Sequence, residues 1–406
     1  MPFLDFVMNN RRWLGGGFLL TLFSSYGQTF YIALSSGRIR DEFGLSHGEF
    51  GTLFMAATLL GATLIPVVGR RIDSTRLENY AVFVLAGMTG SMLLIAVSNH
   101  VAVLFIALAG TRMFGQGLMP HAAMTATGRW FARNRGKAVS VVALGHQFGE
   151  SVMPISFVAI AAVAGWRSSW LINAVILVVI VLPLVFVAMR TDRIPGAAEA
   201  DGGEEGRQWS RAEALRDFRF WILLAGLLAP PVIGSVVFFH QVYLTEIRGW
   251  ALALFAGSTP ILSLFAIAAT ILTGVLIDRF GAIRLVPPML LFLAVANIAL
   301  GLVASAVAIV VYMALMGVTF GMFASVFGAI LPEIYGTRHL GAIKGVATSA
   351  MVIGTALGPG LSGWAIDAGA GLPAIIIGLG AYSLAATPLM GWLAMQGFNP
   401  DRKPVA

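Results

Sequence analysis

Twelve apolar segments, each about as long as a bilayer-spanning helix, follow one another along the chain. A helix that crosses the hydrocarbon core of a membrane needs about 20 consecutive apolar residues. The segments lie at roughly 13–36, 48–68, 79–98, 101–126, 138–164, 168–189, 219–244, 252–277, 285–304, 306–330, 345–366 and 373–395. The sequence therefore predicts an all-α integral membrane protein with twelve transmembrane helices.

Composition supports this class and narrows the chemistry. Hydrophobic residues make up 58% of the 406 residues and charged residues only 11%, whereas soluble domains are nearer to about 25% charged. Cysteine is absent from the sequence, which excludes disulfides, thiolate-ligated haem and cysteine-ligated zinc. The chain carries no Walker loop and no His, Asp or Glu cluster with metal-ligand spacing. We therefore expect no cofactor, no metal and no enzymatic activity.

One long polar interruption, 190–218, divides the apolar segments into six and six. Its centre is rich in Gly, Ala and Glu, which is typical of a flexible linker. Ser210 and Glu213 have the spacing of a capping box, which predicts a short amphipathic helix before the seventh span. The expected organisation is a six-helix bundle at 1–189, a cytoplasmic linker at 190–218 and a second six-helix bundle at 219–406.

The positive charges predict the orientation. If both termini are cytoplasmic, the 26 lysines and arginines fall in inner segments, except for four in outer loops and one within a span. The exceptions are Arg38, Arg40, Arg167 and Arg248 outside, and Arg112 in the fourth span. This asymmetry follows the positive-inside rule and explains the net charge of +7 without nucleic acid. We expect a monomeric, multi-pass protein of the plasma membrane, which in a bacterium is the inner membrane.

The two halves repeat one another. At one constant offset, six residues of the first half match identical residues of the second: Gly69 and Gly274, Asp73 and Asp278, Arg133 and Arg338, Gly136 and Gly341, Gly149 and Gly354, and Pro154 and Pro359. Parallel six-helix repeats are a known transporter plan, with the substrate site near the midplane between them. The repeated glycines and prolines are interpreted as framework that permits close helix approach and bending.

Three ionisable residues inside apolar segments are not repeated. Arg112 lies in the fourth span, and His146 and Glu150 lie one turn apart in the fifth. At the same offset their positions hold Gly317, Met351 and Thr355. Ionisable residues at membrane depth are functional candidates by default. We expect Arg112 to bind an anionic substrate group, and Glu150 and His146 to carry protons. The alternative is a buried Arg112–Glu150 ion pair that only holds two helices together.

Other polar and aromatic residues are further candidates for substrate binding. Tyr26 and Gln28 lie in an unusually polar part of the first span, and Gln116 follows Arg112 by one turn. His240 and Tyr243 lie near the outer end of the seventh span, and Phe323 lies in the tenth. For His240 and Tyr243, anchoring at the membrane interface is the competing interpretation.

The loop between the eighth and ninth spans carries the most specific motif. It reads Gly274-Val-Leu-Ile-Asp278-Arg279-Phe280-Gly281-Ala-Ile-Arg284 and resembles the cytoplasmic G-x-x-x-D-R-x-G-x-x-R loop of the major facilitator superfamily. The first-half copy keeps Gly69 and Asp73 but departs from the rest of the motif. The resemblance implies a conformational latch formed by Asp73, Asp278, Arg279, Gly281 and Arg284. The alternative is a basic loop whose arginines only follow the positive-inside rule.

The resemblance extends over essentially the whole length. Arg112 with Gly115 and Gly117 resembles the fourth-span arginine motif of that superfamily. Trp130-Phe131 through Arg135-Gly136, Gly145-x3-Gly149-x4-Pro154 and Gly165-Trp166-Arg167 are also similar to its pattern. The implied fold is the major facilitator fold, two pseudo-symmetric six-helix bundles that work by alternating access.

Within this superfamily the chain looks most similar to organic-anion and monocarboxylate carriers. The expected activity is secondary active transport of a small organic solute, a carboxylate or other organic anion, by proton-coupled symport. Its partners would be that solute, a proton or other coupling ion, and the lipid bilayer. One alternative is proton-driven efflux of amphiphilic drugs, suggested by the Met-rich and aromatic-rich spans, although Glu150 follows Gly149 where an exporter would carry proline. Another is a membrane sensor that binds solute without moving it.

Overall fold

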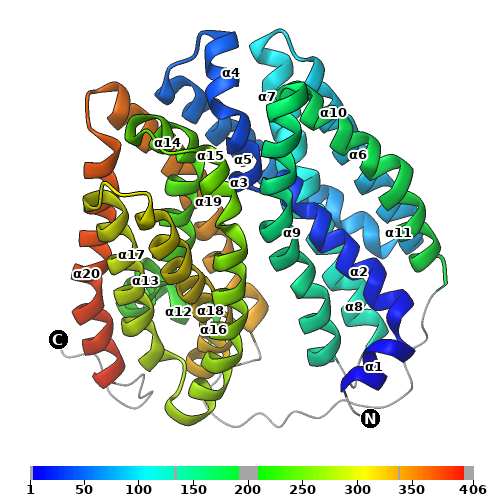
Figure 1. Ribbon diagram of the computed structural model, residues 1–406. Helices are drawn as coiled ribbons and strands as arrows, with labels where there is room; N and C mark the ends of the chain where they lie inside the picture. Colours follow the sequence, from blue (N-terminus) through cyan, green and yellow to red (C-terminus); the bar gives the residue numbers. More distant parts are fainter. Residues whose placement is uncertain (1–2, 132–134, 192–208, 337–338, 397–406) are drawn as a thin grey trace. The chain divides into compact units, whose positions relative to one another are not determined.

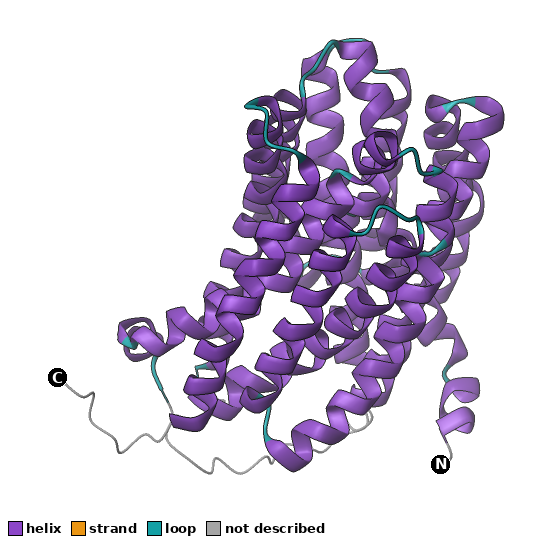
Figure 2. Ribbon diagram, turned by 60° about the vertical axis from the view of Figure 1, so that its left-hand side comes forward, coloured by secondary structure: helices purple, strands orange, loops and turns teal. Residues whose placement is uncertain are grey.

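The computed structural model describes residues 3–131, 135–191, 209–336 and 339–396, and within these ranges every regular element is helical (Figures 1 and 2). The all-α prediction is confirmed. Eleven helical segments within these ranges are long and apolar enough to cross a membrane. The first predicted span is not among them, because it is divided into several short pieces. Together with the eleven, this interrupted segment brings the number of apolar segments to twelve.

Two units make up the chain, and each is described by itself. The first unit contains residues 1–200 together with 238–259 and 359–367. Its elements are α1 (Phe3–Asn9), α2 (Arg11–Phe23), η1 (Ser24–Gly27), α3 (Thr29–Ile32), η2 (Ala33–Ser35), α4 (Ser36–Phe43), α5 (His47–Gly69), η3 (Arg70–Asp73), α6 (Leu77–Val97), α7 (Val101–Thr111), η4 (Arg112–Leu118), α8 (Met119–Trp130), α9 (Arg135–Ala164), α10 (Trp166–Ile176), η5 (Leu177–Val181), α11 (Leu182–Met189), α14 (Gln241–Arg248) and α15 (Leu252–Gly257).

The second unit contains residues 201–237, 260–358 and 368–406. Its elements are α12 (Arg211–Arg216), most of α13 (Phe218–Phe239), α16 (Thr259–Phe280), η6 (Ile283–Leu285), α17 (Val286–Leu302), α18 (Val307–Tyr335), most of α19 (Leu340–Asp367) and α20 (Leu372–Gln396). One end of α13 and one end of α19 belong to the first unit. Parts of the sequence that follow the linker therefore pack with helices that precede it.

The first apolar segment is interrupted near its middle. The helix α2 ends at Phe23, a tight 3-10 turn covers Ser24–Gly27, and Gln28 adopts an extended conformation with φ −83° and ψ 153° before α3 begins. Polar side chains accompany the break, and the Ser24 hydroxyl donates to the Thr21 carbonyl at 2.6 Å. Non-helical backbone at membrane depth is tolerated only where protein buries it or a cavity receives it.

The fourth apolar segment has its own irregularity. Residues Arg112–Leu118 form a π-helix, η4, between α7 and α8. Wide turns of this kind often occur at functional sites. Gly27 and Gly115 bring the two irregular segments into contact, since a Cβ atom added to Gly27 would lie 2.6 Å from the Gly115 Cα atom. Glycine at both positions permits this backbone approach.

The helix α9 packs against the first segment through two more glycines. A Cβ atom at Gly145 would contact the Phe18 carbonyl oxygen, and one at Gly149 would contact the Ser25 hydroxyl. The second half shows the equivalent contact, because a Cβ atom at Gly354 would lie 2.7 Å from the Val232 side chain. The repeated glycine thus packs α9 in the first half, and α19 in the second, onto the first helix of the same half. This agrees with its interpretation as framework.

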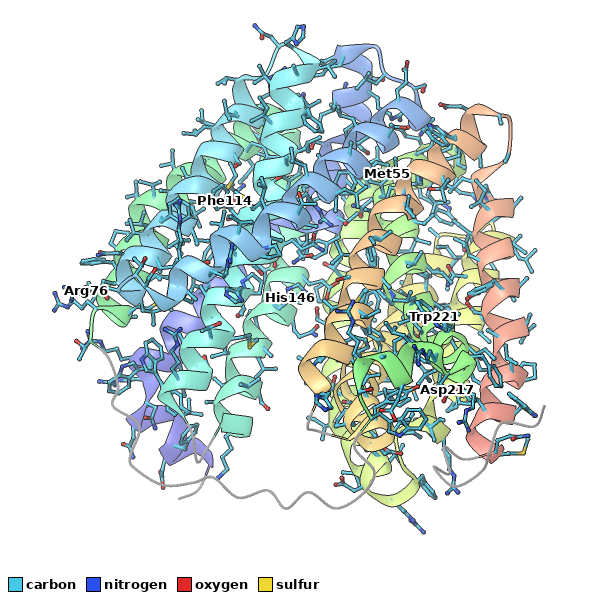
Figure 3. The ribbon with its side chains drawn as sticks, turned by 180° about the vertical axis from the view of Figure 1, so that it is seen from behind. Met55, Arg76, Phe114, His146, Asp217 and Trp221 are labelled. Atoms are coloured by element: carbon cyan, nitrogen blue, oxygen red, sulfur yellow. The ribbon has the colours of Figure 1, made fainter. Side chains whose placement is uncertain are left out.

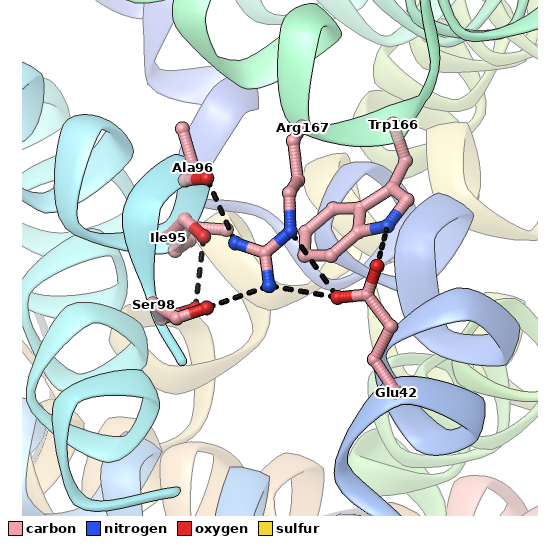
Figure 4. A network of polar contacts seen from close by, with 6 residues as sticks. All are labelled: Glu42, Ile95, Ala96, Ser98, Trp166 and Arg167. Atoms are coloured by element: carbon pink, nitrogen blue, oxygen red, sulfur yellow. Dashed lines mark hydrogen bonds and ion pairs between the residues drawn. The ribbon is translucent and has the colours of Figure 1, made fainter. Parts of the chain in front are cut away.

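Two polar junctions orient helices at their ends. Ser210 and Glu213 form the predicted capping box of α12. At the turn into α13, which Figure 3 marks by Asp217 and Trp221, the Trp221 indole donates to the Leu215 carbonyl at 2.9 Å. At the start of α10, Arg167 pairs with Glu42 of α4 at 2.7 Å and donates to the carbonyls of Ala96 and Ser98 at the end of α6 (Figure 4).

The glycine contact at the break gives a stability prediction. In Gly27→Ala, the new methyl group would press on backbone atoms of η4 that cannot rotate away, so we expect a loss of about 1–3 kcal/mol and a lower melting temperature in detergent. The matched control is Gly90→Ala on α6, where no atom lies within 4 Å of the added Cβ. Equal melting temperatures for the two variants would contradict the close packing described for Gly27.

Candidate functional site

Arg112 begins the π-helix and is buried with a relative exposure of 2%. Its Nε atom donates to the Thr58 hydroxyl of α5 at 3.1 Å, and its Nη1 atom donates to the Gly27 carbonyl at 3.0 Å. The guanidinium lies 5.1 Å from the centre of the Phe54 ring. An arginine without an ion pair can be kept in the interior only if such contacts replace its hydration.

The break in the first segment supplies one of these contacts. In a continuous helix, the Gly27 carbonyl would accept a bond from an amide one turn later. Because the chain turns extended at Gln28, this carbonyl is available to Arg112 instead. The two irregular segments are therefore complementary. The broken segment supplies the hydrogen-bond acceptor, and η4 supplies the cation that donates to it.

The guanidinium is not saturated. The Nη2 atom of Arg112 is buried and has no hydrogen-bond partner among the described residues. The hydroxyl groups of Ser25 and Tyr31, on either side of the break, are likewise buried without a described partner. Such groups are rare in native structures and each needs an explanation, such as water or a ligand. An oxygen-rich solute could satisfy the Nη2 donor.

Glu150 follows Gly149, whose backbone packs against Ser25 of the broken segment. Its side chain has a relative exposure of 6%, and among the described residues it has no ion pair or hydrogen bond. Arg112 also has no carboxylate partner there. The buried ion pair between these residues, one of the two sequence-based interpretations, is therefore not formed in this structure. His146 is half-buried one turn earlier on α9 and is labelled in Figure 3.

Tyr26, Gln28 and Gln116 surround the same break. The Tyr26 hydroxyl donates to the Asn173 side chain of α10 at 2.8 Å, and its ring lies 5.0 Å from that of Tyr31. Gln28 and Gln116 are half-buried, with no described hydrogen bond from either side chain. Tyr26 is thus tied to the helix packing, while the two amides are available. Substrate binding by all three stays a prediction.

His240 and Tyr243 lie in a different cluster of the first unit. The His240 ring nitrogen Nε2 is 2.8 Å from the Ser362 hydroxyl, and the Tyr243 ring centre is 4.0 Å from that of His47. The sequence did not associate His47 with them. Phe323 belongs to α18 in the second unit, where its ring lies 5.3 Å from that of Phe327. Their predicted contacts with substrate remain untested.

The predicted latch residues of the second half lie in the last turn of α16 and in the segment that leads through η6. Asp278, Arg279 and Arg284 are exposed, without an ion pair among the described residues. Gly281 has a left-handed φ of 80°, and the following Ala282 amide donates to Glu333 of α18 at 2.8 Å. The side chain of Asp73 lies outside the described part of the chain. A latch role for these residues stays a prediction.

The second half lacks the charge at the equivalent place. Gly317 of α18 stands where Arg112 would be, and a Cβ atom added there would meet the Leu262 carbonyl of α16. The second unit thus closes this position by direct backbone packing, whereas the first unit fills it with a guanidinium against α5. The arginine is not needed to build a six-helix half, which favours a role in function.

Sequence reasoning missed three members of the site: Thr58, Phe54 and the Gly27 carbonyl. Thr58 had a weak signal as a polar residue in the middle of the second span. A carbonyl exposed by a helix break has no signal of its own in residue identity. Within the described ranges, no group of three His, Cys, Asp or Glu residues could hold a metal ion.

Apolar helices with a buried cation at a broken segment are features that membrane transport proteins use at their solute sites. The family model described as Major Facilitator Superfamily matches residues 17–310 and 259–405. The chain belongs to this superfamily, and its members move small solutes across membranes by alternating access. The family prediction is therefore confirmed.

The individual proteins to which the chain is similar share few identical residues with it. The chain is 26% identical over 280 residues to "Uncharacterized 38 kDa protein in 23S RNA operon" of Thermoproteus tenax, covering 68% of this chain and 67% of that protein. It shares its fold with an inward-facing bacterial homolog of the human lysosomal transporter Spinster, with TM-score 0.69, 16% identity and 100% of both chains covered. The nucleoside transporter NupG gives TM-score 0.71 and 11% identity, over 97% of this chain and 99% of that one.

The Thr58 contact gives a second prediction. Thr58→Val keeps the side-chain shape but leaves the Arg112 Nε donor without a partner, so we expect a loss of about 1–3 kcal/mol, visible as a lower melting temperature. Thr63→Val on the same helix is the matched control, because Thr63 is exposed and bonds only within its own helix. A melting temperature that falls equally in both variants would show that the Arg112 contact is not the cause.

Proposed function

We propose that this protein is a proton-coupled secondary transporter that binds a small organic carboxylate at Arg112. The observation that carries the proposal is the unsatisfied Nη2 donor of a buried guanidinium beside a helix break. Arginine recognises carboxylates through paired N–H donors in a fixed planar fork. Two donors of this fork are already held by Thr58 and Gly27, which orients the remaining edge.

The proposed coupling residue is Glu150, with His146 one turn away on α9. A carboxylate at 6% exposure without a partner is costly to keep charged, and binding a proton removes that cost. Glu150 and Arg112 both adjoin the broken first segment, one through Gly149 and the other through Gly27 and Gly115. Movement of this segment during transport would change the surroundings of both groups together.

In the proposed orientation both termini are cytoplasmic, and the junction between α4 and α5 faces outward. The membrane is the plasma membrane, the bacterial inner membrane if the chain is bacterial. The proposal takes symport as the direction of coupling, since a proton on Glu150 and an anion on Arg112 would leave together on the side of lower proton activity.

The solute class is tested by binding to purified protein. A thermal-shift screen should compare carboxylates, sugars, amino acids and cationic amphiphiles, and we expect carboxylates to raise the melting temperature. Arg112→Lys keeps the charge but loses the fork, so we expect carboxylate affinity to fall by about 10- to 100-fold. Arg216→Lys, at an exposed position of α12, is the control. Unchanged affinity in Arg112→Lys, or stabilisation by cationic amphiphiles alone, would overturn the proposal.

The coupling residue is tested by flux in proteoliposomes. In Glu150→Gln, the side chain can no longer release a proton, so we expect carboxylate uptake to lose its stimulation by an inward proton gradient while exchange of solute for solute continues. Glu246→Gln, at an exposed carboxylate, should retain the stimulation. Gradient-driven uptake in Glu150→Gln at the rate of the parent protein would contradict the role of Glu150. Binding without any flux in the parent protein would support a sensor instead.

A further inference from the structure

A second polar cluster of the first unit joins helices from both halves of the sequence. It contains Arg40 of α4, His47 at the start of α5, His240 and Tyr243 at the start of α14, and Asp367 at the end of α19. A space of about 10 Å³, enough for about one water molecule, is lined by the first four of these residues together with Ser36, Phe50 and Phe239. We refer to the five residues as the outer cluster.

Asp367 fastens the end of α19 to the start of α5. Its carboxylate accepts from the Ser46 hydroxyl at 2.6 Å, from the Gly48 amide at 2.7 Å and from the His47 amide at 3.2 Å. These amides are among the unsatisfied donors of a helix N-terminus, where a negative charge is favourable. The contact therefore holds the second-half helix α19 against the first-half helix α5.

Glycines let these two helices approach closely. A Cβ atom at Gly51 would lie 2.6 Å from the Pro359 carbonyl oxygen and 3.1 Å from the Gly360 Cα atom. Gly48 and Gly363 make a similar contact one turn away, Gly48 against Trp364 and Gly363 against the His47 backbone. Small residues at the contact are typical of closely packed membrane helices.

The hydrogen bond between Arg40 and His47 fixes the protonation state of His47. The Arg40 Nη1 atom lies 3.1 Å from the His47 Nε2 atom. Arginine nitrogens can only donate, so Nε2 must accept. An imidazole that accepts at one nitrogen carries its proton on the other and is neutral. The arrangement seen here therefore requires uncharged His47.

A proton on His47 would convert this bond into a repulsion. Nε2 would lose its acceptor lone pair and present a second cation to Arg40 at the same separation. The other groups around it are His240 and Tyr243 of α14, Asp367 of α19 and Glu49 on its own helix. Asp367 attracts the added charge, but it is exposed and already accepts three bonds, so water screens that attraction. The repulsion between Arg40 and a protonated His47 therefore outweighs the attraction to Asp367, and the net interaction is unfavourable.

The outer cluster is connected to Arg112 through α5. Phe50 stacks on Phe239 at 5.3 Å between ring centres, and Phe54 lies 4.9 Å from the same ring. Phe54 is also the ring beneath the Arg112 guanidinium, and Phe239 directly precedes His240. A change at His47 that shifts α5 against α13 and α14 would therefore reach the residues that hold Arg112.

Solvent can reach this end of the unit. A cavity of about 750 Å³ shares α4 and α14 with the outer cluster and is lined by Gly37, Arg38 and Asp41 on α4 and by Val242, Thr245 and Glu246 on α14. In the orientation predicted from the basic residues, this cavity lies on the outer side of the membrane. His47 itself is half-buried and Asp367 is exposed, so external protons would have access to the cluster.

We propose that His47 is a proton-binding site that controls an outer gate, in which α4 and α5 separate from α14 and α19 when His47 is protonated. The proposal rests on the proposed transport function and adds the step by which external acid favours the outward-open state. A proton on His47 breaks the bond to Arg40, weakens the contacts at the start of α5, and admits solute toward Arg112.

The test measures exposure of a buried position in the outer cluster as pH changes. The chain has no cysteine, so Ser36→Cys introduces a single thiol at a position that is 5% exposed and lines the small space. Its alkylation rate in nanodiscs is divided by that of Asn99→Cys, an exposed position after α6, which corrects for thiol ionisation. Lowering the pH from about 8 to about 5 spans the usual titration range of histidine.

We expect the corrected rate for Ser36→Cys to rise by about tenfold at the acid end. This is the effect expected if the proton affinity of His47 differs by about one pH unit between the closed and open states of the gate. Adding His47→Gln, which can accept from Arg40 but cannot be protonated, should remove this rise. A corrected rate that does not change with pH would overturn the proposal, as would a rise that persists with His47→Gln. Loss of that persistent rise with His240→Gln would assign the proton to His240 instead. The experiment uses no solute, so its failure leaves carboxylate binding at Arg112 intact, and loss of binding there leaves this result intact.

Discussion

The hydrogen bond from Arg112 to the Gly27 carbonyl is the interaction on which the site depends. It requires a carbonyl that is not used within its own helix, and the break between Ser24 and Gln28 provides one. It also requires that two backbones approach closely, which Gly27 and Gly115 allow. Neither irregular segment would be stable alone in an apolar medium, because each leaves polar groups without partners. Together they stabilise a buried cation whose Nη2 nitrogen has no hydrogen-bond partner among the described residues.

The helix α5 connects the Arg112 site to the outer cluster. One of its ends is held by Asp367 and Arg40, and its middle supplies Thr58 and Phe54 to Arg112. About 11 residues separate His47 from Thr58, which corresponds to about 16 Å along a helix. A rigid helix of this length transmits movement between its contacts. Solute binding at Arg112 and proton binding at the end of α5 would then act on the same element.

The sequence predicted the helical fold and the family, because apolar runs of bilayer length and a specific loop motif are both local signals. It also separated the unrepeated Arg112 from the repeated Gly149 and Gly354, and the packing supports that distinction. It did not predict the π-helix or the use of Gly27 as an acceptor, since both depend on contact between distant segments. His47 escaped notice for the same reason, because its amide bonds to Asp367, which is far away in sequence.

The most direct test of the account is solute protection of thiols placed around the break. In the cysteine-free chain, Gln28→Cys and Gln116→Cys would each carry one thiol beside Arg112, and Ser74→Cys would carry one at an exposed position. The measurement is the alkylation rate with and without the carboxylate that most stabilises the protein. The account predicts that this solute slows alkylation at Gln28→Cys and Gln116→Cys but not at Ser74→Cys. Equal rates at all three positions with a solute that demonstrably binds would place binding elsewhere and contradict the account.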